Sequence, residues 1–101
     1  MVKTVDYLKL CDGMHLDVQY ESLIKDGVIL SLSKTEFRIL FYLTINKNKI
    51  VSFENLINFS WKLSSTVTRR ELYVYIARIR KKLDLNTKIV CIRNKGYIFI
   101  D

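Results

Sequence analysis

Two helix-capping sequences constrain where helices begin in this chain of 101 residues. Ser33 is followed three residues later by Glu36, and Thr68 is followed three residues later by Glu71. In such a capping box, the hydroxyl accepts a hydrogen bond from the third backbone N–H of the helix, and the acidic side chain reaches back to the N-cap backbone. The first box predicts a helix that runs from Phe37 to about Ile45. The second predicts a longer helix, over residues 68–83.

Short extended segments surround these helices. Four of them precede the first box and are separated by the turn dipeptides Asp12-Gly13 and Asp26-Gly27, which predicts an antiparallel meander over residues 1–31. The segments are Tyr7–Leu10, His15–Gln19, Ser22–Lys25 and Val28–Leu30. A short helix over Glu54–Phe59, reaching toward Trp61, is expected between the two boxes.

Two further segments, Ile89–Arg93 and Tyr97–Ile100, flank Asn94-Lys95-Gly96 and predict a terminal hairpin over residues 88–101. A sheet, a three-helix core over residues 33–84 and a closing hairpin together describe an α+β fold, the winged helix-turn-helix. At 101 residues the chain has room for one such domain and not for a second core.

The net charge of the chain lies entirely in its C-terminal part. Residues 61–101 contain ten Lys or Arg and three acids, whereas residues 1–60 contain seven of each. A basic face on a small domain is typical of proteins that bind a phosphate backbone. Charge alone fits a solvated face that keeps the domain soluble equally well.

Other classes of function find little support in the sequence. No apolar stretch approaches the roughly 18 residues that span a bilayer, and the first residues lack the apolar region of a signal peptide. Cys11 and Cys91 lack metal-ligand spacing, so we expect two buried free thiols, no metal and no cofactor. His15 is the single histidine and has no catalytic constellation around it, so we expect no enzyme activity. These features predict an intracellular, cytoplasmic protein.

The predicted helix over residues 68–83 has two different faces. At 100° per residue, one narrow stripe is apolar and should face the core; it contains Leu72, Ile76, Ile79 and Leu83. The opposite face combines cations with small apolar residues; it contains Arg70, Val74, Ala77 and Lys81, with Arg78 at its margin. In a DNA major groove Arg can donate two hydrogen bonds to guanine, and Val or Ala can touch a thymine methyl group. The alternative is an ordinary basic surface helix.

Neighbouring residues are suited to the DNA backbone. Tyr75 can donate its hydroxyl to a phosphate, whereas the Tyr73 ring is expected to pack against neighbouring helices; for both tyrosines, core or flank packing stays open. Arg69 lies in the first turn, where a phosphate would also meet free backbone N–H groups. Arg93 and Lys95 at the hairpin tip are suited to a phosphate or minor-groove contact.

The sequence resembles the OmpR/PhoB family of bacterial response-regulator DNA-binding domains over nearly its whole length. The similarity is carried by residues 32–40, by residues 51–61 with Trp61, by residues 70–83 and by the wing segment, residues 92–97. The resemblance implies transcriptional regulation, with the helix over residues 68–83 in the major groove of double-stranded DNA. It implies DNA contact by Arg70, Val74, Tyr75 and Arg78, phosphate or supporting contacts by Trp61 and Arg80, and wing contacts by Arg93 and Tyr97.

The resemblance also implies partners. The loop Lys62-Leu63-Ser64-Ser65-Thr66-Val67 would touch RNA polymerase, and two copies would pair head to tail on direct repeats. A phosphorylatable receiver domain would belong to the full-length protein of a two-component system if this chain is an excised effector domain; the alternative, a chain that acts without a receiver domain, stays open. The chain departs from the family pattern at Tyr73, Tyr75 and Asn94, where Asp, His and Gly are common. A different class of function, a winged-helix module whose basic face docks an acidic protein surface, stays open.

Overall fold

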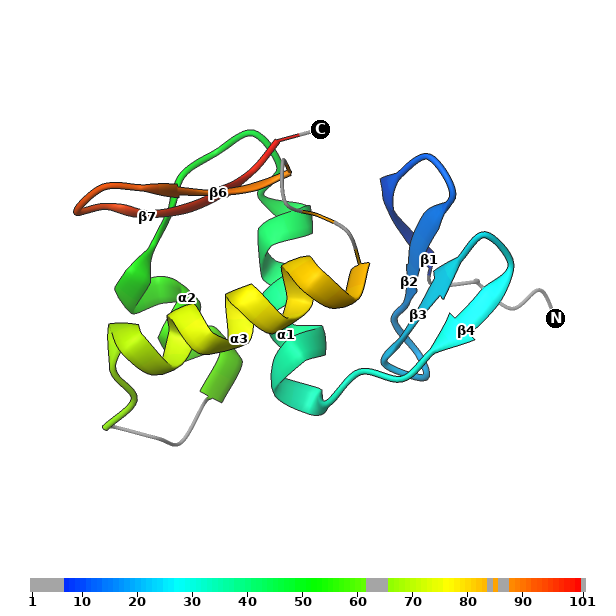
Figure 1. The fold of residues 1–101 in the computed structure, drawn as a ribbon, viewed down its shortest axis with the longest axis horizontal. Helices are drawn as coiled ribbons and strands as arrows, with labels where there is room; N and C mark the ends of the chain where they lie inside the picture. The colour runs from blue at the N-terminus through cyan, green and yellow to red at the C-terminus, as the bar shows by residue number, and fades with distance from the viewer. Residues whose placement is uncertain (1–6, 62–65, 84, 86–87, 101) are drawn as a thin grey trace, which may run out of the picture.

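A computed structural model of the chain describes residues 7–61, 66–83, 85 and 88–100. Figure 1 shows a sheet at one end, a hairpin at the other and helix α1 between them. The predicted α+β winged helix-turn-helix is confirmed. The elements in chain order are β1 (Tyr7–Cys11), β2 (Met14–Asp17), β3 (Ser22–Lys25), β4 (Val28–Leu30), α1 (Lys34–Ile45), β5 (Val51–Ser52), α2 (Phe53–Trp61), α3 (Arg69–Leu83), β6 (Ile89–Ile92) and β7 (Gly96–Phe99).

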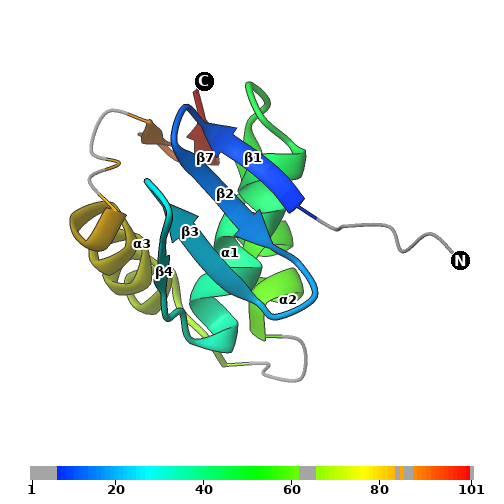
Figure 2. The same ribbon diagram turned by 90° about the vertical axis from the view of Figure 1, so that its right-hand side faces the viewer.

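The N-terminal sheet is the predicted antiparallel meander, in the order β1-β2-β3-β4. Its last turn contains Asp26 (φ 50°) and Gly27 (φ 82°). Two successive positive φ angles are the signature of the two-residue hairpin turn that Asp-Gly favours. The sheet covers α1 (Figure 2), and Leu10, Leu16 and Leu23 on its strands are fully buried.

Both predicted capping boxes form. The Ser33 hydroxyl accepts from the Glu36 N–H at 3.1 Å while a Glu36 carboxylate oxygen accepts from the Ser33 N–H at 3.0 Å. Thr68 and Glu71 exchange the corresponding bonds at 3.2 and 3.3 Å. Thr68 is therefore the N-cap, and α3 begins at Arg69, one residue after the predicted start. Helix α2 is longer at both ends than the predicted Glu54–Phe59.

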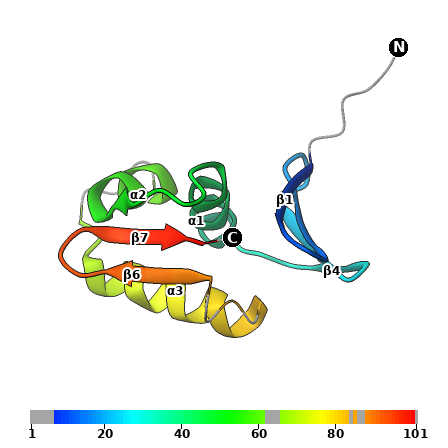
Figure 3. The ribbon, with the colours of Figure 1, turned by 90° about the horizontal axis from the view of Figure 1, so that it is seen from above.

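The terminal hairpin, β6 and β7, is the predicted wing, and its turn contains Asn94 at φ 62°. The two-residue strand β5 was not predicted; it pairs with β7 and completes a three-stranded sheet in the order β5-β7-β6. Figure 3 shows the hairpin alongside α3, with α2 on its other side. On the α2 side the Phe53 N–H donates to the Lys95 carbonyl at 3.2 Å. The wing is thereby attached to the start of α2.

Buried side chains from both sheets and all three helices form one cluster. Helix α3 contributes its entire apolar stripe: Leu72, Ile76, Ile79 and Leu83 have no exposed surface. The expectation of two buried thiols is wrong, because Cys91 is exposed and Cys11 is only partly buried. Cys91 lies on β6, where strand alternation alone does not tell which positions the helices cover.

Candidate nucleic-acid interface

Burial of the apolar stripe turns the opposite face of α3 to the solvent. Arg70, Val74, Arg78 and Lys81 are exposed on it, and Ala77 is partly buried among them. Because the stripe is fully buried, α3 cannot rotate without exposing four large apolar side chains, each of which stabilises the fold by roughly 1.5–3 kcal/mol when buried. The fold therefore presents cations and small apolar groups together on a fixed surface.

An aromatic pair supports one flank of this face. Trp61, the last residue of α2, meets Tyr75 edge to face, with ring centroids 5.2 Å apart and an interplanar angle of 85°. The Arg78 guanidinium lies 5.3 Å from the centre of the Tyr75 ring. Tyr75 is partly buried by these contacts. Trp61 thus packs on Tyr75, and the Tyr75 ring lies beside Arg78. The phosphate or supporting contact that the resemblance implies for Trp61 stays a prediction.

The other flank of α3 faces the wing. Arg80 donates from Nε to the Ile89 carbonyl at 2.9 Å, and its guanidinium lies 5.9 Å from the Tyr97 ring centre. The Tyr97 ring meets Phe53 edge to face at 5.7 Å, and Arg69 stacks on the Phe53 ring at 4.4 Å. Arg80 therefore attaches α3 to the wing, and Arg69 lies against the start of α2.

Two tyrosines on this side differ from expectation. Tyr97, predicted to contact DNA from the wing, is only 2% exposed, so its side chain supports the wing from within. Tyr73, expected to pack its ring against neighbouring helices, is instead 57% exposed. Burial raises the pKa of Tyr97 to about 12, an effect strengthened by the neighbouring Cys91 and Tyr73 and opposed by the positive charge of Arg80.

The tip of the wing is exposed and basic. Arg93, Asn94 and Lys95 all face the solvent. The tip is held in shape by the Lys95 N–H, which donates to the Ile92 carbonyl at 3.0 Å, and by the left-handed conformation of Asn94. Arg93 and Lys95 therefore project from an ordered turn at the end of the hairpin.

Contacts at the C-terminal end of α3 were not predicted from the sequence. The Lys82 ammonium lies 3.1 Å from Glu36 and also donates to the Ser31 carbonyl at 3.3 Å. Lys25 of β3 donates to the Leu83 carbonyl at 3.5 Å. The Glu36–Lys82 ion pair could have been suspected from the sequence, because a capping carboxylate that is buried needs a nearby cation. These contacts fix the end of α3 to the N-terminal part of the fold.

The predicted polymerase-contact loop, residues 62–67, lies mostly outside the described residues. Positions 62–65 are not described, Thr66 is exposed and Val67 is partly buried.

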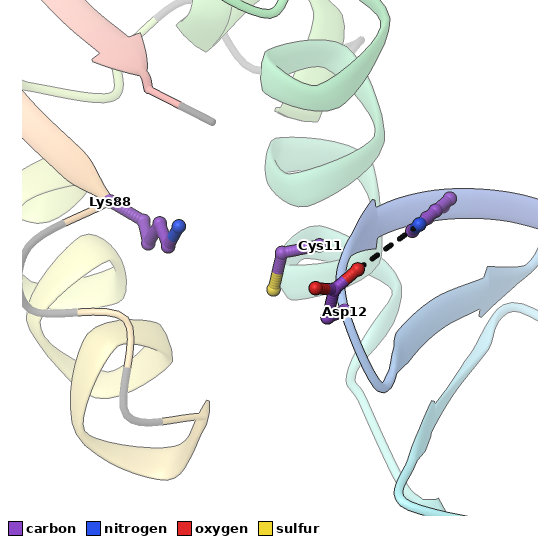
Figure 4. Close-up of a pocket in the computed structure, with 4 residues that line it drawn as sticks. Cys11, Asp12 and Lys88 are labelled. Atoms are coloured by element: carbon purple, nitrogen blue, oxygen red, sulfur yellow. Dashed lines mark ion pairs between the residues drawn. The ribbon is translucent and has the colours of Figure 1, made fainter.

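A shallow cavity of about 340 Å³ lies between the β1–β2 hairpin and Lys88, just before β6 (Figure 4). Lys9, Cys11, Asp12 and Lys88 line it, and Lys9 pairs with Asp12 at 3.2 Å. Over residues 7–61, 66–83, 85 and 88–100, no group of three or more metal-ligating side chains occurs. In the same part of the chain, no helix is long and apolar enough to cross a bilayer.

A helix with a basic, partly apolar exposed face, braced by a second helix and flanked by a basic wing, defines the winged helix-turn-helix class of DNA-binding domains. Comparison with known proteins gives the particular family. The family described as "Transcriptional regulatory protein, C terminal" matches residues 27–99, and the chain belongs to it. It is a DNA-binding domain for transcriptional regulation, of the effector type found in response regulators.

Individual relatives agree with this membership. Response regulator ArlR of Staphylococcus aureus is 31% identical over 90 residues, which are 86% of this chain and 41% of the relative. The chain thus spans about two fifths of the length of the curated relatives it matches.

Two solved structures are similar in fold. The DNA-binding domain of CpxR from E. coli has a TM-score of 0.82 at 24% identity, over 95% of this chain and 97% of that one. The RstA DNA-binding domain of Klebsiella pneumoniae, solved in complex with the RstA box, has a TM-score of 0.80 at 25% identity, over 94% of this chain and 97% of that one.

Proposed function

We propose that this domain binds double-stranded DNA in a sequence-specific way, with α3 in the major groove and the wing on the adjacent minor groove or backbone. Arg70, Arg78 and Lys81 would reach base edges and phosphates, with Val74 and Ala77 toward thymine methyl groups. Arg93 and Lys95 would contact the backbone from the wing. Arg69, at the first turn of α3, would meet a phosphate together with free backbone N–H groups.

The observation that carries this proposal is the division of α3 into two faces. All four residues of its stripe are fully buried, and the opposite face holds three exposed cations around Val74. A helix that only kept the domain soluble would have no reason to expose Val74, which is 40% accessible. The wing, with two further exposed cations, lies beside α3. A single DNA duplex can therefore contact the exposed face of α3 and the wing at the same time.

Selection of bound duplexes from a random DNA pool tests sequence specificity. Arg78→Ala should then weaken binding to the selected duplex by about 1–3 kcal/mol and relax the preference at one base position. Lys9→Ala is the matched control, because it removes one positive charge from the N-terminal sheet, distant from α3. Equal losses for Arg78→Ala on selected and scrambled duplexes would contradict base reading by this residue.

Salt dependence separates this proposal from a module that docks an acidic protein. Phosphate binding predicts that log affinity falls linearly with log salt, with a slope of about −0.9 per neutralised phosphate. A domain that binds no duplex even at low salt would refute the proposal and favour the protein-docking module.

We further propose the setting in which the domain acts. On the strength of family membership, it would be linked to a receiver domain, pair head to tail on direct repeats about one helical turn apart, and touch RNA polymerase through residues 62–67. It would act in the cytoplasm and without catalysis of its own. Selected duplexes should then contain two half-sites in the same orientation. Single or inverted half-sites would argue against head-to-tail pairing.

A further inference from the structure

The flank of α3 that faces the wing contains an exposed aromatic residue with no role so far. Tyr73 and Arg80 are two turns apart on this flank. Arg80 is held by the Ile89 carbonyl and lies over the Tyr97 ring. Tyr73, nearer the start of the helix, is 57% exposed. We call Tyr73 and Arg80, together with Cys91 and Tyr97 of the hairpin, the wing flank. The hairpin covers this flank at Arg80 and leaves it exposed at Tyr73.

Tyr73 lies close to the wing. Tyr73 and Cys91 are both among the neighbours that raise the pKa of the Tyr97 hydroxyl. Cys91 pairs with Tyr97 across the hairpin and is itself exposed. Tyr73 of α3 and Cys91 of β6 are thus two exposed side chains on the side where α3 faces the hairpin.

The two tyrosines of α3 differ in what covers them. Tyr75, on the far flank, is packed against Trp61 and carries Arg78 on its ring. Tyr73 has no ring-stacking or hydrogen-bond partner among the described residues. Its position is about 90° around the helix from the centre of the cationic face, at 100° per residue. A side chain placed there points beside the base edges and toward the backbone of one DNA strand.

We propose that Tyr73 is a contact to the DNA backbone between the two grooves. When α3 lies in the major groove and the wing lies on the adjacent minor groove, the strand that separates these grooves passes along the wing flank. The Tyr73 hydroxyl donates a hydrogen bond to a phosphate oxygen of that strand, and its ring covers a deoxyribose. The contact positions the domain on the duplex and carries no base preference. This inference rests on the proposed function.

Tyr73→Phe tests the hydrogen bond, and Tyr7→Phe is its matched control because Tyr7 is also 57% exposed but lies on β1. The 101-residue chain is titrated with selected and scrambled duplexes at several salt concentrations. Tyr73→Phe should weaken both by about ten- to a hundredfold, the size of a hydrogen bond to a charged group. The salt slope should not change, because a neutral donor releases no counterion. Tyr7→Phe should bind like the wild type.

A second measurement asks whether DNA covers the wing flank. The exposed Cys91 should react quickly with a maleimide in the free domain and slowly when the selected duplex is saturating. Cys11, on the N-terminal sheet, is the internal control and should react at the same rate with and without DNA.

The outcomes separate the two proposals. If the wild-type domain binds no duplex, the proposed function fails. If it binds and Tyr73→Phe has wild-type affinity, or Cys91 reacts at the same rate in the complex, the assignment of Tyr73 is overturned and the proposed function stands.

Discussion

Replacement of Gly96 by alanine should detach the wing from the rest of the fold. Gly96 is the first residue of β7 and pairs with Ser52 of β5. A Cβ at this position would lie 1.8 Å from the Val51 carbonyl oxygen and 2.9 Å from the Ser52 Cα. Both atoms belong to the backbone, so no side-chain rotation relieves the overlap. Strands β5 and β7 would have to move apart to make room for the methyl group.

The magnitude follows from what this separation breaks. The two pairs between β5 and β7 would be lost, and so would the bond from the Phe53 N–H to the Lys95 carbonyl beside them. Each backbone hydrogen bond contributes a net 0.5–1.5 kcal/mol or so. Val51 and Tyr97, now 6% and 2% exposed, would also lose part of their packing. We expect the free energy of unfolding to fall by about 3 kcal/mol.

Urea unfolding followed by far-ultraviolet circular dichroism measures this change, and Gly27→Ala is the control. A Cβ on Gly27 would have no atom within 4 Å, but the φ of this residue is 82°. Alanine there should therefore cost only the roughly 1–2 kcal/mol of a left-handed conformation. If Gly96→Ala is no more destabilising than Gly27→Ala, the close approach of β5 to β7 does not hold the wing, and the reasoning is refuted.

Three further predictions concern α3 and the wing. Ile76→Ala should lower the free energy of unfolding by about 2–5 kcal/mol, because it opens a cavity in the core, whereas Val74→Ala on the exposed face should change it by roughly 0.5 kcal/mol or less; equal losses in urea titrations would contradict the assignment of faces. Thr68→Ala should cost about 1 kcal/mol through loss of the N-cap, and an unchanged urea midpoint would show that the capping box adds nothing. Tyr97 should ionise near its raised pKa of about 12 in an alkaline titration followed by tyrosinate absorbance. Because the fold favours the protonated phenol, its contribution to stability is fully present below pH 10 and is lost as the pH rises toward 12; Tyr97→Phe should remove both effects.

Local signals account for the parts of the fold that were predicted correctly. The capping boxes at Ser33 and Thr68 join residues three apart, so their hydrogen bonds need no knowledge of the tertiary structure. The buried stripe of α3 follows from helical periodicity, and the Asp26-Gly27 turn follows from the positive φ angles that this dipeptide tolerates.

The features that were missed depend on contacts between distant segments. Strand β5 is two residues long and exists only because β7, far along the chain, pairs with it. The environments of two tyrosines were missed for the same reason. Tyr97 is buried where a contact to DNA was expected, and Tyr73 is exposed where packing against helices was expected. The position of the wing decides which flank of α3 is covered, and neither helical nor strand periodicity contains that information.

The structure also shows that the charge surplus of the C-terminal part overstates the cations available to DNA. Arg80 is bonded to the Ile89 carbonyl, and Lys82 is bonded to Glu36 and the Ser31 carbonyl. Both lie in the last turn of α3, where positive charge also complements the helix dipole. They fix the helix to the wing and to α1, and each already donates to at least one acceptor within the fold.

The exposed cations that remain on α3 and the wing tip form the smaller set that can neutralise phosphates: Arg69, Arg70, Arg78, Lys81, Arg93 and Lys95. Each neutralised phosphate adds about −0.9 to the slope of log affinity against log salt. The slope per domain should therefore reflect these side chains and not all ten Lys and Arg of residues 61–101. Charge composition identifies the class of ligand, whereas the internal partners of each cation determine how much of that charge the ligand meets.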